Sequence, residues 1–417
     1  MPASHASEGA SVPSIPYHRD LADCLKKHED GLWDWFSSDE LTENADKDAR
    51  LYLLKNAVRL NEEDHEELHA LAREIAGKLG IDAPITLYQA SNHGQRNAML
   101  ITMTSEVAVY FGGDILSFLS PDEHRALLAH EMAHFLFKTV EDGDFKISDN
   151  LLTWICQNGG EPSFQRSLWL SQLYQEIYAD RIAVEVCGGF EAPLSLLVKV
   201  GAGITNVSPG SYLEQAEEAL AVATNDGKYS GAESQSHPEL FIRALAMRDW
   251  VDDHANANSK LKHMLEGQPQ LDALDLLQQA RTTALTEAVI ETLLKPQFAE
   301  SERLEILARR YFPHFDRRQT HAVDRDELDR EMRALPDGLK SYFCYVLADF
   351  ALGDPDLDDL VLIDAVNLAA NWEMTEVFER IARSDLGIAA KRFAQLQASS
   401  AKASGSDAMP ACGEISA

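Results

Sequence analysis

Apolar positions after residue 120 predict a helix that is buried in a protein core. Leucine, phenylalanine, methionine and alanine residues from Ala126 to Leu136 cover most of the surface of such a helix. Ser120 is a preferred N-cap residue, and Pro121 fits the first helical position. Glu123 stands three residues after the cap, as in a capping box. We therefore expect the helix to begin at this point.

Two short apolar segments predict a pair of strands. Residues 98–103 and 107–111 have the length and apolar content of strands, and the polar pair Thr104-Ser105 joins them. Such a pair presents an edge to which an extended peptide can add as a further strand. With the helical patterns elsewhere, this predicts an α+β fold that is predominantly helical and contains a small sheet.

The C-terminal part of the chain is predicted to be entirely helical. Leu271, Leu274 and Leu277 recur at helical spacing. Apolar runs at 342–352 and 360–370 predict two helices on either side of an acidic turn. Composition divides the chain into a disordered N-terminal tail, a first domain, a helical connector, a helical domain and a disordered C-terminal tail, with bounds at 1–16, 17–257, 258–335, 336–396 and 397–417.

The buried helix after Ser120 carries three polar residues in an HExxH pattern. His130 and His134 stand four residues apart, so they are turned by only about 40° and separated by about 6 Å along a helix. Both imidazoles can then bind one zinc ion. Glu131 follows the first histidine and can reach a water molecule on that ion. The spacing therefore predicts the site of a metal hydrolase, with one Zn²⁺ per chain.

A second HExxH pattern, from His65 to His69, has a different setting. Glu62, Glu63 and Asp64 precede it, and such a concentration of acids is typical of a solvated helix face. We interpret this second copy as unrelated to metal binding.

A third ligand is predicted in a second helix further along the chain. Leu173, Ile177 and Val184 fall on one stripe of this helix, which a glycine pair ends. Glu176 and Asp180 share another face. Glu176 suits the third position of a two-histidine, one-glutamate zinc site, and Asp180 suits a carboxylate that orients His130. The alternative is a solvated i,i+4 acid pair beside Arg181.

These motifs resemble the HtpX-like and CAAX prenyl protease family of zinc endopeptidases, within the gluzincins. HExxH is followed some forty residues later by ExxAD, at Glu176 to Asp180. Residues 96–99 resemble the family's Asn-Ala edge-strand motif, and residues 236–238 with Arg243 resemble its Ser-His-Pro segment and following helix. The resemblance spans residues 60–250 and implies a zincin-type domain. Met99 replaces the family's phenylalanine, and the family's membrane spans are missing.

The resemblance and the residue chemistry together imply peptide hydrolysis. Zinc on His130, His134 and Glu176 would activate water, and Glu131 would act as general base and then pass the proton to the leaving amine. His237 is the leading candidate for stabilising the oxyanion, because the resemblance places its segment near the site. The rival donors are Tyr174 and Tyr178, and the alternative for His237 is an ordinary loop residue. Substrate backbone is expected at Asn97, Ala98 and Met99.

Composition narrows the class of partner. The net charge is 37 − 68 = −31. So strong a negative charge disfavours nucleic acid and anionic membranes, and it favours unfolded or basic polypeptides as substrates. No stretch approaches the roughly 20 apolar residues that cross a bilayer. The five cysteines show no CxxC spacing, and residues 1–16 lack the apolar core of a secretory signal. A cytoplasmic location is expected.

The helical domain leaves a second hypothesis open. Residues 336–386, with their acidic turn, weakly resemble TerB-like, tellurite-resistance-associated domains and suggest a protein partner. The turn imitates the start of an EF-hand but lacks its glycine and its final glutamate, so a helix–helix turn is favoured. The alternative function is therefore a catalytically silent helical adaptor or stress-associated interaction protein. A zinc site closed by four protein ligands would favour this alternative, whereas a site with one open position would favour the enzyme. His124 is a possible fourth ligand, but it lies on a different helix face from His130.

Overall fold

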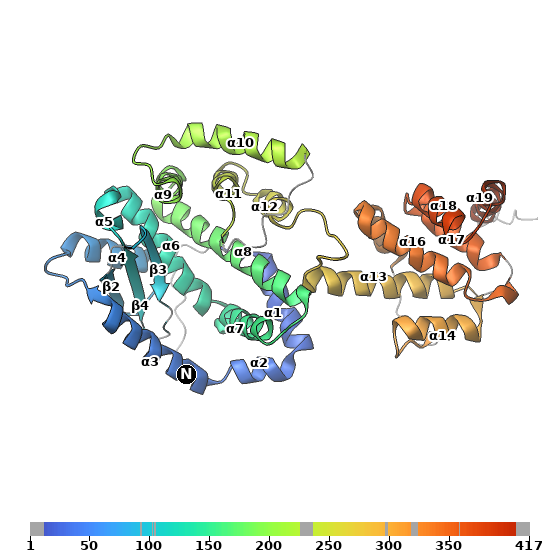
Figure 1. Cartoon of the computed structure of the whole chain (residues 1–417), viewed down its shortest axis with the longest axis horizontal. Coiled ribbons are helices and arrows are strands. Elements are labelled where there is room, and N and C mark those ends of the chain that lie inside the picture. The colour runs from blue at the N-terminus through green and yellow to red at the C-terminus, as the bar shows by residue number, and fades with distance from the viewer. Residues whose placement is uncertain are drawn as a thin grey trace, which may run out of the picture. The chain divides into compact units, whose positions relative to one another are not determined.

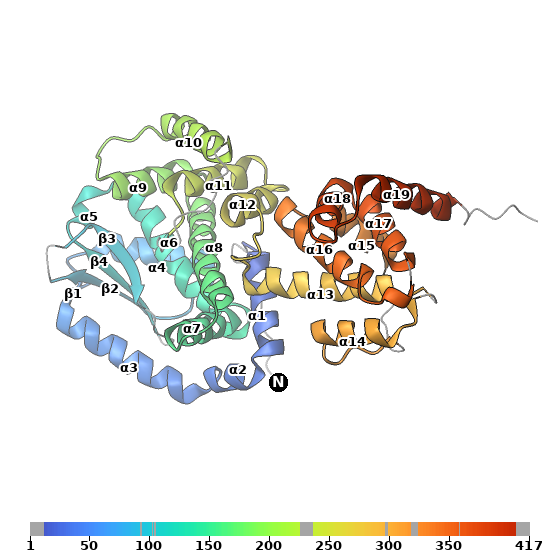
Figure 2. The ribbon, with the colours of Figure 1, turned by 45° about the vertical axis from the view of Figure 1, so that its right-hand side comes forward.

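The computed structural model confirms a predominantly helical α+β fold with one four-stranded sheet. It describes residues 12–91, 94–101, 103, 106–225, 237–296, 299–317, 324–357 and 359–405. The chain divides into two compact units. The first extends to Gly267 and also includes Asp275–Leu277, and the second comprises Gln268–Leu274 and the chain from Gln278 onward. The labels of the helices and strands are those of Figures 1 and 2.

The sheet belongs to the first unit and has the strand order β1-β2-β4-β3. Its strands are β1 (Ala57–Arg59), β2 (Ile85–Ala90), β3 (Asn97–Ile101) and β4 (Val107–Gly112). β2 and β4 are parallel, whereas β1–β2 and β3–β4 are antiparallel. The predicted pairing of the last two strands is confirmed, and it leaves β3 at one edge. The predicted joining pair Thr104-Ser105 lies outside the described residues.

The two faces of the sheet meet different helices. Leu87, Val109 and Phe111 point from one face into the main core of the first unit. On the other face, Leu53 of α3 (Asp39–Asn56) packs with Tyr88 and other sheet residues in a small separate cluster. The sheet is therefore covered on both faces, and β1 and β3 are its two edge strands.

Two long helices form the centre of the first unit. α6 (Pro121–Thr139) and α8 (Pro162–Cys187) lie side by side in both views of the ribbon (Figures 1 and 2). The predicted capping box begins α6: the Ser120 hydroxyl accepts from the backbone N–H of Glu123, whose carboxylate accepts from the backbone N–H of Ser120. Gly188 ends α8 with φ 73°, a conformation that favours glycine.

The remaining helices of the first unit surround this pair. Helices α7 and α9 pack against both α6 and α8, and α11 packs against α8 and α9. The bounds are α1 (Pro16–His28), α2 (Asp30–Phe36), α4 (Glu66–Leu79), α5 (Ile115–Phe118), α7 (Asp144–Gln157), α9 (Glu191–Ala202), α10 (Pro209–Asn225), α11 (Leu240–Asp252) and α12 (Ala257–Glu266). Among the described residues, no helix combines the length and the apolarity that crossing a bilayer requires.

The second unit is built from helices around one hydrophobic core. Its elements are α13 (Leu276–Leu294, whose first two residues belong to the first unit), α14 (Glu302–Tyr311), α15 (Arg325–Arg333), α16 (Asp337–Ala351), α17 (Leu360–Asn371), α18 (Thr375–Ser384) and α19 (Ala390–Gly405). The core runs from Leu285 to Leu396. Residues 285–335 thus share a core with the helices that follow, rather than forming a separate connector. Residues 397–405 are helical, where the composition predicts a disordered tail.

The acidic turn between α16 and α17 is held by hydrogen bonds to α14. Asp354 accepts from Arg303 at 2.8 Å and from the hydroxyl of Ser301. Asp356 accepts from the same arginine at 3.0 Å. Asp358 lies outside the described residues. Because Arg303 already donates to both Asp354 and Asp356, the turn is better explained as a helix–helix connection than as a cation site.

Candidate metal centre

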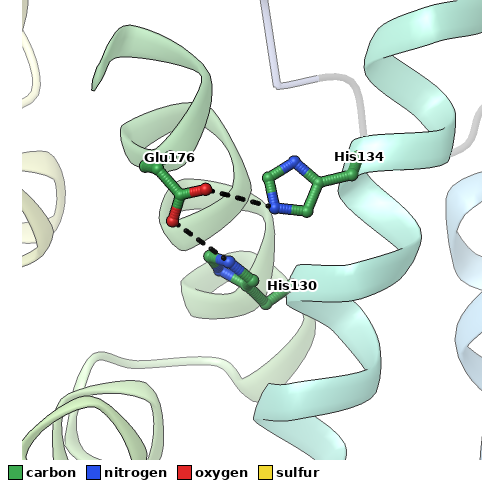
Figure 3. A group of neighbouring side chains, drawn as sticks. All are labelled: His130, His134 and Glu176. Carbon is green, nitrogen blue, oxygen red and sulfur yellow. Dashed lines mark ion pairs between the residues drawn. The ribbon is translucent and has the colours of Figure 1, made fainter. Parts of the chain in front are cut away.

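The two histidines of α6 and one carboxylate of α8 face one another. His130 Nε2 lies 3.6 Å from one Glu176 oxygen, and His134 Nε2 lies 3.6 Å from the other (Figure 3). The side chains approach from two neighbouring helices, so the packing of α6 against α8 sets their spacing. The sequence therefore identified three groups that the fold brings together.

The geometry of these three groups fits a zinc ion. One ligand atom from each of His130, His134 and Glu176 lies within 4.8 Å of the other two. Tetrahedral zinc with ligands at about 2.0–2.2 Å places neighbouring ligand atoms about 3.4 Å apart. Each histidine lies 3.6 Å from its nearer Glu176 oxygen, Oε2 for His130 and Oε1 for His134, and this separation is close to that value. Two imidazoles and a carboxylate are also the donor types of catalytic zinc sites.

Asp180 orients the first histidine, as the i,i+4 spacing on α8 predicts. Its Oδ1 atom lies 3.1 Å from His130 Nδ1. This contact favours the tautomer that carries its proton on Nδ1, which leaves Nε2 free to face Glu176. The site is thus arranged for Nε2 of His130 to bind a cation.

Arg243 is a part of the site whose role the sequence did not reveal. It lies on α11, is only 9% exposed, and donates two hydrogen bonds to Asp180, at 2.6 and 2.7 Å. Its third nitrogen lies 3.3 Å from Glu176. Arg243 therefore holds both carboxylates, whereas its sequence pattern indicates only a helix that follows the segment of His237.

The charges of these groups shift one another's pKa. Burial raises the pKa of Asp180 and of Glu176, but Arg243 and His130 outweigh it, so the pKa of each is lowered. Burial lowers the pKa of His130, but the same two carboxylates raise it to about 10. With His130 protonated, two carboxylates, one guanidinium and one imidazolium sum to −2 + 2 = 0. A cation that displaces the proton of His130 would meet a net charge of −1, which favours its binding.

His134 and Glu131 differ from His130 in their protonation. Burial lowers the pKa of His134 to about 3, and the charges of His130 and Lys138 act in the same direction. A neutral imidazole is the form that binds metal. Burial raises the pKa of Glu131 to about 7, opposed by the charge of His130 and a hydrogen bond from the backbone of Leu100. A pKa near neutrality suits a group that accepts and releases a proton.

His237 is the third histidine near Glu176. Its Nε2 atom lies 3.7 Å from Glu176 Oε1, and its side chain is 60% exposed. The rival residues are elsewhere: the Tyr174 hydroxyl donates to Glu266 at 2.8 Å, and the ring of Tyr178 packs against Phe137. Neither tyrosine lines the cavity that adjoins the metal ligands. His237 is therefore the better placed of the three candidates. Ser236, which precedes it, lies outside the described residues.

A cavity of about 540 Å³ adjoins these groups. His130, Glu131, His134, Glu176 and His237 lie on its wall. The edge strand β3 borders it with the predicted substrate-binding residues and one more, namely Asn97, Ala98, Met99 and Leu100. Apolar residues of α9 form another side. A polypeptide segment in this cavity would therefore lie next to both an unpaired strand edge and the metal ligands.

The second HExxH copy does not form a comparable site. His65 is the N-cap of α4, so its two histidines do not both lie within the helix. His69 Nε2 is 3.1 Å from the carbonyl of Leu60. His124 of α6 makes a similar contact with the carbonyl of Leu116, at 3.0 Å. In the parts of the chain that the structure describes, the only cluster suited to a metal is His130, His134 and Glu176.

Comparison with known proteins agrees with this geometry. Residues 62–156 match the model of peptidase family M48. The match includes α6 with its HExxH motif and ends before α8, so it does not reach Glu176 or Asp180. No curated protein and no solved structure shows significant similarity to the chain. Residues 62–156 are thus similar to a family of metallopeptidases, and this similarity covers less than a quarter of the chain.

Proposed function

We propose that the chain is a zinc-dependent endopeptidase that hydrolyses polypeptides. The observation that carries the proposal is the meeting of His130, His134 and Glu176 beside a cavity that also contains the buried acid Glu131. The match to a metallopeptidase family is independent support. The finer resemblance to HtpX-like and CAAX prenyl proteases is part of this proposal.

Each residue of the site has its own role in the proposed reaction. His130, His134 and Glu176 would hold zinc, which when bound would polarise the scissile carbonyl and make water more acidic. Glu131 takes a proton from the attacking water and passes it to the leaving amine. Burial raises the pKa of Glu131, and a pKa near neutrality suits a group that accepts and releases a proton. Asp180 and Arg243 keep the ligands in position.

His237 would stabilise the negative charge that develops on the carbonyl oxygen. It lies on the cavity wall, close to the metal ligands, and is exposed enough to contact a substrate. A donor aimed at that oxygen is commonly worth about 10²–10³ in kcat. His237 is therefore assigned a catalytic role in the proposal.

The substrate would bind as an extended strand along β3. The edge of β3 that faces away from β4 has no strand partner within the described sheet. Main-chain hydrogen bonds to Asn97, Ala98 and Met99 would hold the peptide whatever its sequence. This mode of binding suits unfolded polypeptides, because a folded chain rarely offers a free extended segment.

An adaptor with a structural zinc site is less well supported. Structural zinc is closed by four protein ligands, whereas catalytic zinc keeps one position open. Of the histidines, cysteines and acids in the described segments, three form the cluster and none adds a fourth ligand. A protein partner for the second unit is a separate proposal. It rests on the weak resemblance of residues 336–386 to TerB-like domains.

Zinc dependence is tested by comparing the two HExxH motifs. His134→Ala should lower bound zinc from one per chain to well below one, and it should abolish cleavage of an unfolded protein. His69→Ala is the matched control and should leave both unchanged. A chelator should stop cleavage by the wild type, and added zinc should restore it. Full activity of the chelated wild type, or equal zinc loss in the two variants, would refute the proposal.

A further inference from the structure

One buried carboxylate joins the metal-binding helix α6 to helix α9. Glu123 is 4% exposed and lies seven residues before His130. Its carboxylate accepts from the Ser195 hydroxyl at 2.7 Å and contacts the Lys199 ammonium at 2.8 and 2.9 Å, and both partners belong to α9. The same carboxylate accepts from the backbone N–H of Ser120, where it completes the capping box of α6. Glu123 therefore begins one helix and holds another.

The pair of Glu123 and Lys199 is charged although it is largely buried. The side chain of Lys199 is 15% exposed, and that of Glu123 is 5% exposed. Burial raises the pKa of Glu123, but hydrogen bonds from Lys199, Ser120 and Ser195 outweigh it, so the pKa is lowered. Separating a buried ion pair leaves an uncompensated charge, which is unfavourable. The contact between α6 and α9 is therefore strongly restrained at this point.

Helix α9 holds Glu123 with one side and lines the cavity with another. Ser195 and Lys199 stand four residues apart and so lie on one side of the helix. The cavity-lining side chains of α9 include Leu196, Leu197 and Val200, which we call the α9 wall. At 100° per residue, the wall is turned by roughly 130° from the polar pair. Glu123 therefore holds α9 from outside the cavity, with the apolar side of the helix facing in.

The α9 wall lies near the metal centre. Leu127 of α6 lines the cavity and stands about one helical turn from both Glu123 and His130. Glu123 and His130 are about 10 Å apart along the helix, a distance that about three residues of an extended peptide cover. The wall is therefore within reach of a substrate side chain close to the scissile bond.

Close packing holds α9 at a second point. Gly201 lies against Leu240 of α11, and a methyl group added to Gly201 would lie 2.8 Å from a methyl carbon of Leu240. Both residues line the cavity. α9 is thus held by polar contacts to α6 and by close packing against α11, and only the first of these can be removed without changing the cavity lining.

We propose that the Glu123–Lys199 pair positions the α9 wall and thereby sets the selectivity of the site for a large apolar side chain of the substrate. Without the pair, α9 would shift relative to α6, and the wall would bury less of that side chain. The loss should fall on substrate binding rather than on chemistry, because neither Glu123 nor Lys199 belongs to the described lining of the cavity. This inference rests on the proposed peptidase function.

The test compares peptides that differ at one side chain. The peptides carry leucine or alanine at each of the three positions on either side of the cleaved bond. Zinc-loaded Glu131→Gln protein reports binding by fluorescence anisotropy, and protein with intact Glu131 reports kcat and KM. Lys199→Met removes the charge and the hydrogen bonds of the ammonium group, whereas Lys199→Arg retains a charged donor. Glu123→Gln is a second variant that keeps the size of the side chain.

The matched control is a second ion pair of the first unit. Arg248 of α11 is 2.8 Å from Asp249, and the two side chains are 23% and 7% exposed. Neither residue belongs to the described lining of the cavity. Arg248→Met therefore removes a comparable ion pair without acting on the α9 wall.

We expect the wild type to favour leucine over alanine by about tenfold at one position, in both assays. Lys199→Met and Glu123→Gln should lower this ratio to about threefold or less, by raising KM while kcat changes less than about twofold. Lys199→Arg should restore most of the ratio, and Arg248→Met should keep it.

Three results would overturn the role of the pair. They are a wild type without leucine preference, an unchanged ratio in both Lys199→Met and Glu123→Gln, and an equal fall of the ratio in Arg248→Met. Equal cleavage by wild type and Glu131→Gln would instead overturn the peptidase function.

Discussion

Replacing Glu131 by glutamine is expected to lower kcat by about 10²–10⁴ while zinc remains bound. Glutamine has nearly the same size and polarity as the glutamate, so the packing of α6 should be preserved. It cannot accept the proton of the attacking water, and general base catalysis typically contributes this factor. Glu131 is only 5% exposed and lines the cavity beside both histidines, so it is placed to act on a water molecule at the metal.

The measurement is zinc content and cleavage of an unfolded protein, made on the same preparations. Glu66→Gln is the matched control, because Glu66 occupies the equivalent position of the second HExxH copy and should change neither quantity. Wild-type activity in the Glu131→Gln variant would contradict the role of Glu131. Loss of zinc together with activity would show that Glu131 acts on the metal ligands rather than on water.

Replacing Arg243 by methionine is expected to destabilise the first unit by about 3–5 kcal/mol. Arg243 is buried and pairs with Asp180 and Glu176, and removing one partner of a buried ion pair leaves uncompensated charge. Arg125→Met is the control, because its pair with Glu74 is more exposed and such pairs contribute at most about 1 kcal/mol. Denaturant unfolding followed by tryptophan fluorescence measures the change, since all tryptophans except Trp372 belong to the first unit.

A second variant separates charge from geometry in this prediction. Arg243→Lys retains the positive charge but not the paired hydrogen bonds to Asp180, so its stability should lie between those of the wild type and Arg243→Met. If Arg243→Met lost no more stability than Arg125→Met, the carboxylates would not depend on Arg243. Zinc affinity should fall in the same order as stability, because Glu176 and Asp180 lose their common partner.

The metal ligands were predictable because each belongs to a local pattern. His130 and His134 are related by one helical turn, and their helix has an explicit start at Ser120. Glu176 and Asp180 are related in the same way on α8. Only the meeting of the two helices was beyond local reasoning, and family resemblance supplied it.

The role of Arg243 and the strand β1 were not predictable from local patterns. Arg243 reaches Asp180 across 63 residues of sequence, and nothing around it indicates that it is buried. β1 has only three residues, two of them exposed, so it has no apolar alternation and depends on pairing with β2. Tertiary contact determines both features.

Domain bounds also depended on tertiary contact. Residues 397–405 contain alanine at three positions, and alanine favours helix, but their serines suggested a disordered tail. They continue α19, which Phe393 and Leu396 anchor in the second core. The boundary after α12 similarly follows from Leu261 and Leu265, which are buried in the first core.

The atoms that surround zinc decide whether the metal centre is catalytic. X-ray absorption spectroscopy of the zinc-loaded protein should show two histidine nitrogens, one carboxylate and one solvent oxygen, all at about 2.0–2.2 Å. His134→Ala should lose this spectrum, and His69→Ala should keep it. A closed shell of four protein ligands, or any sulfur at about 2.3 Å, would contradict a catalytic centre formed by His130, His134 and Glu176.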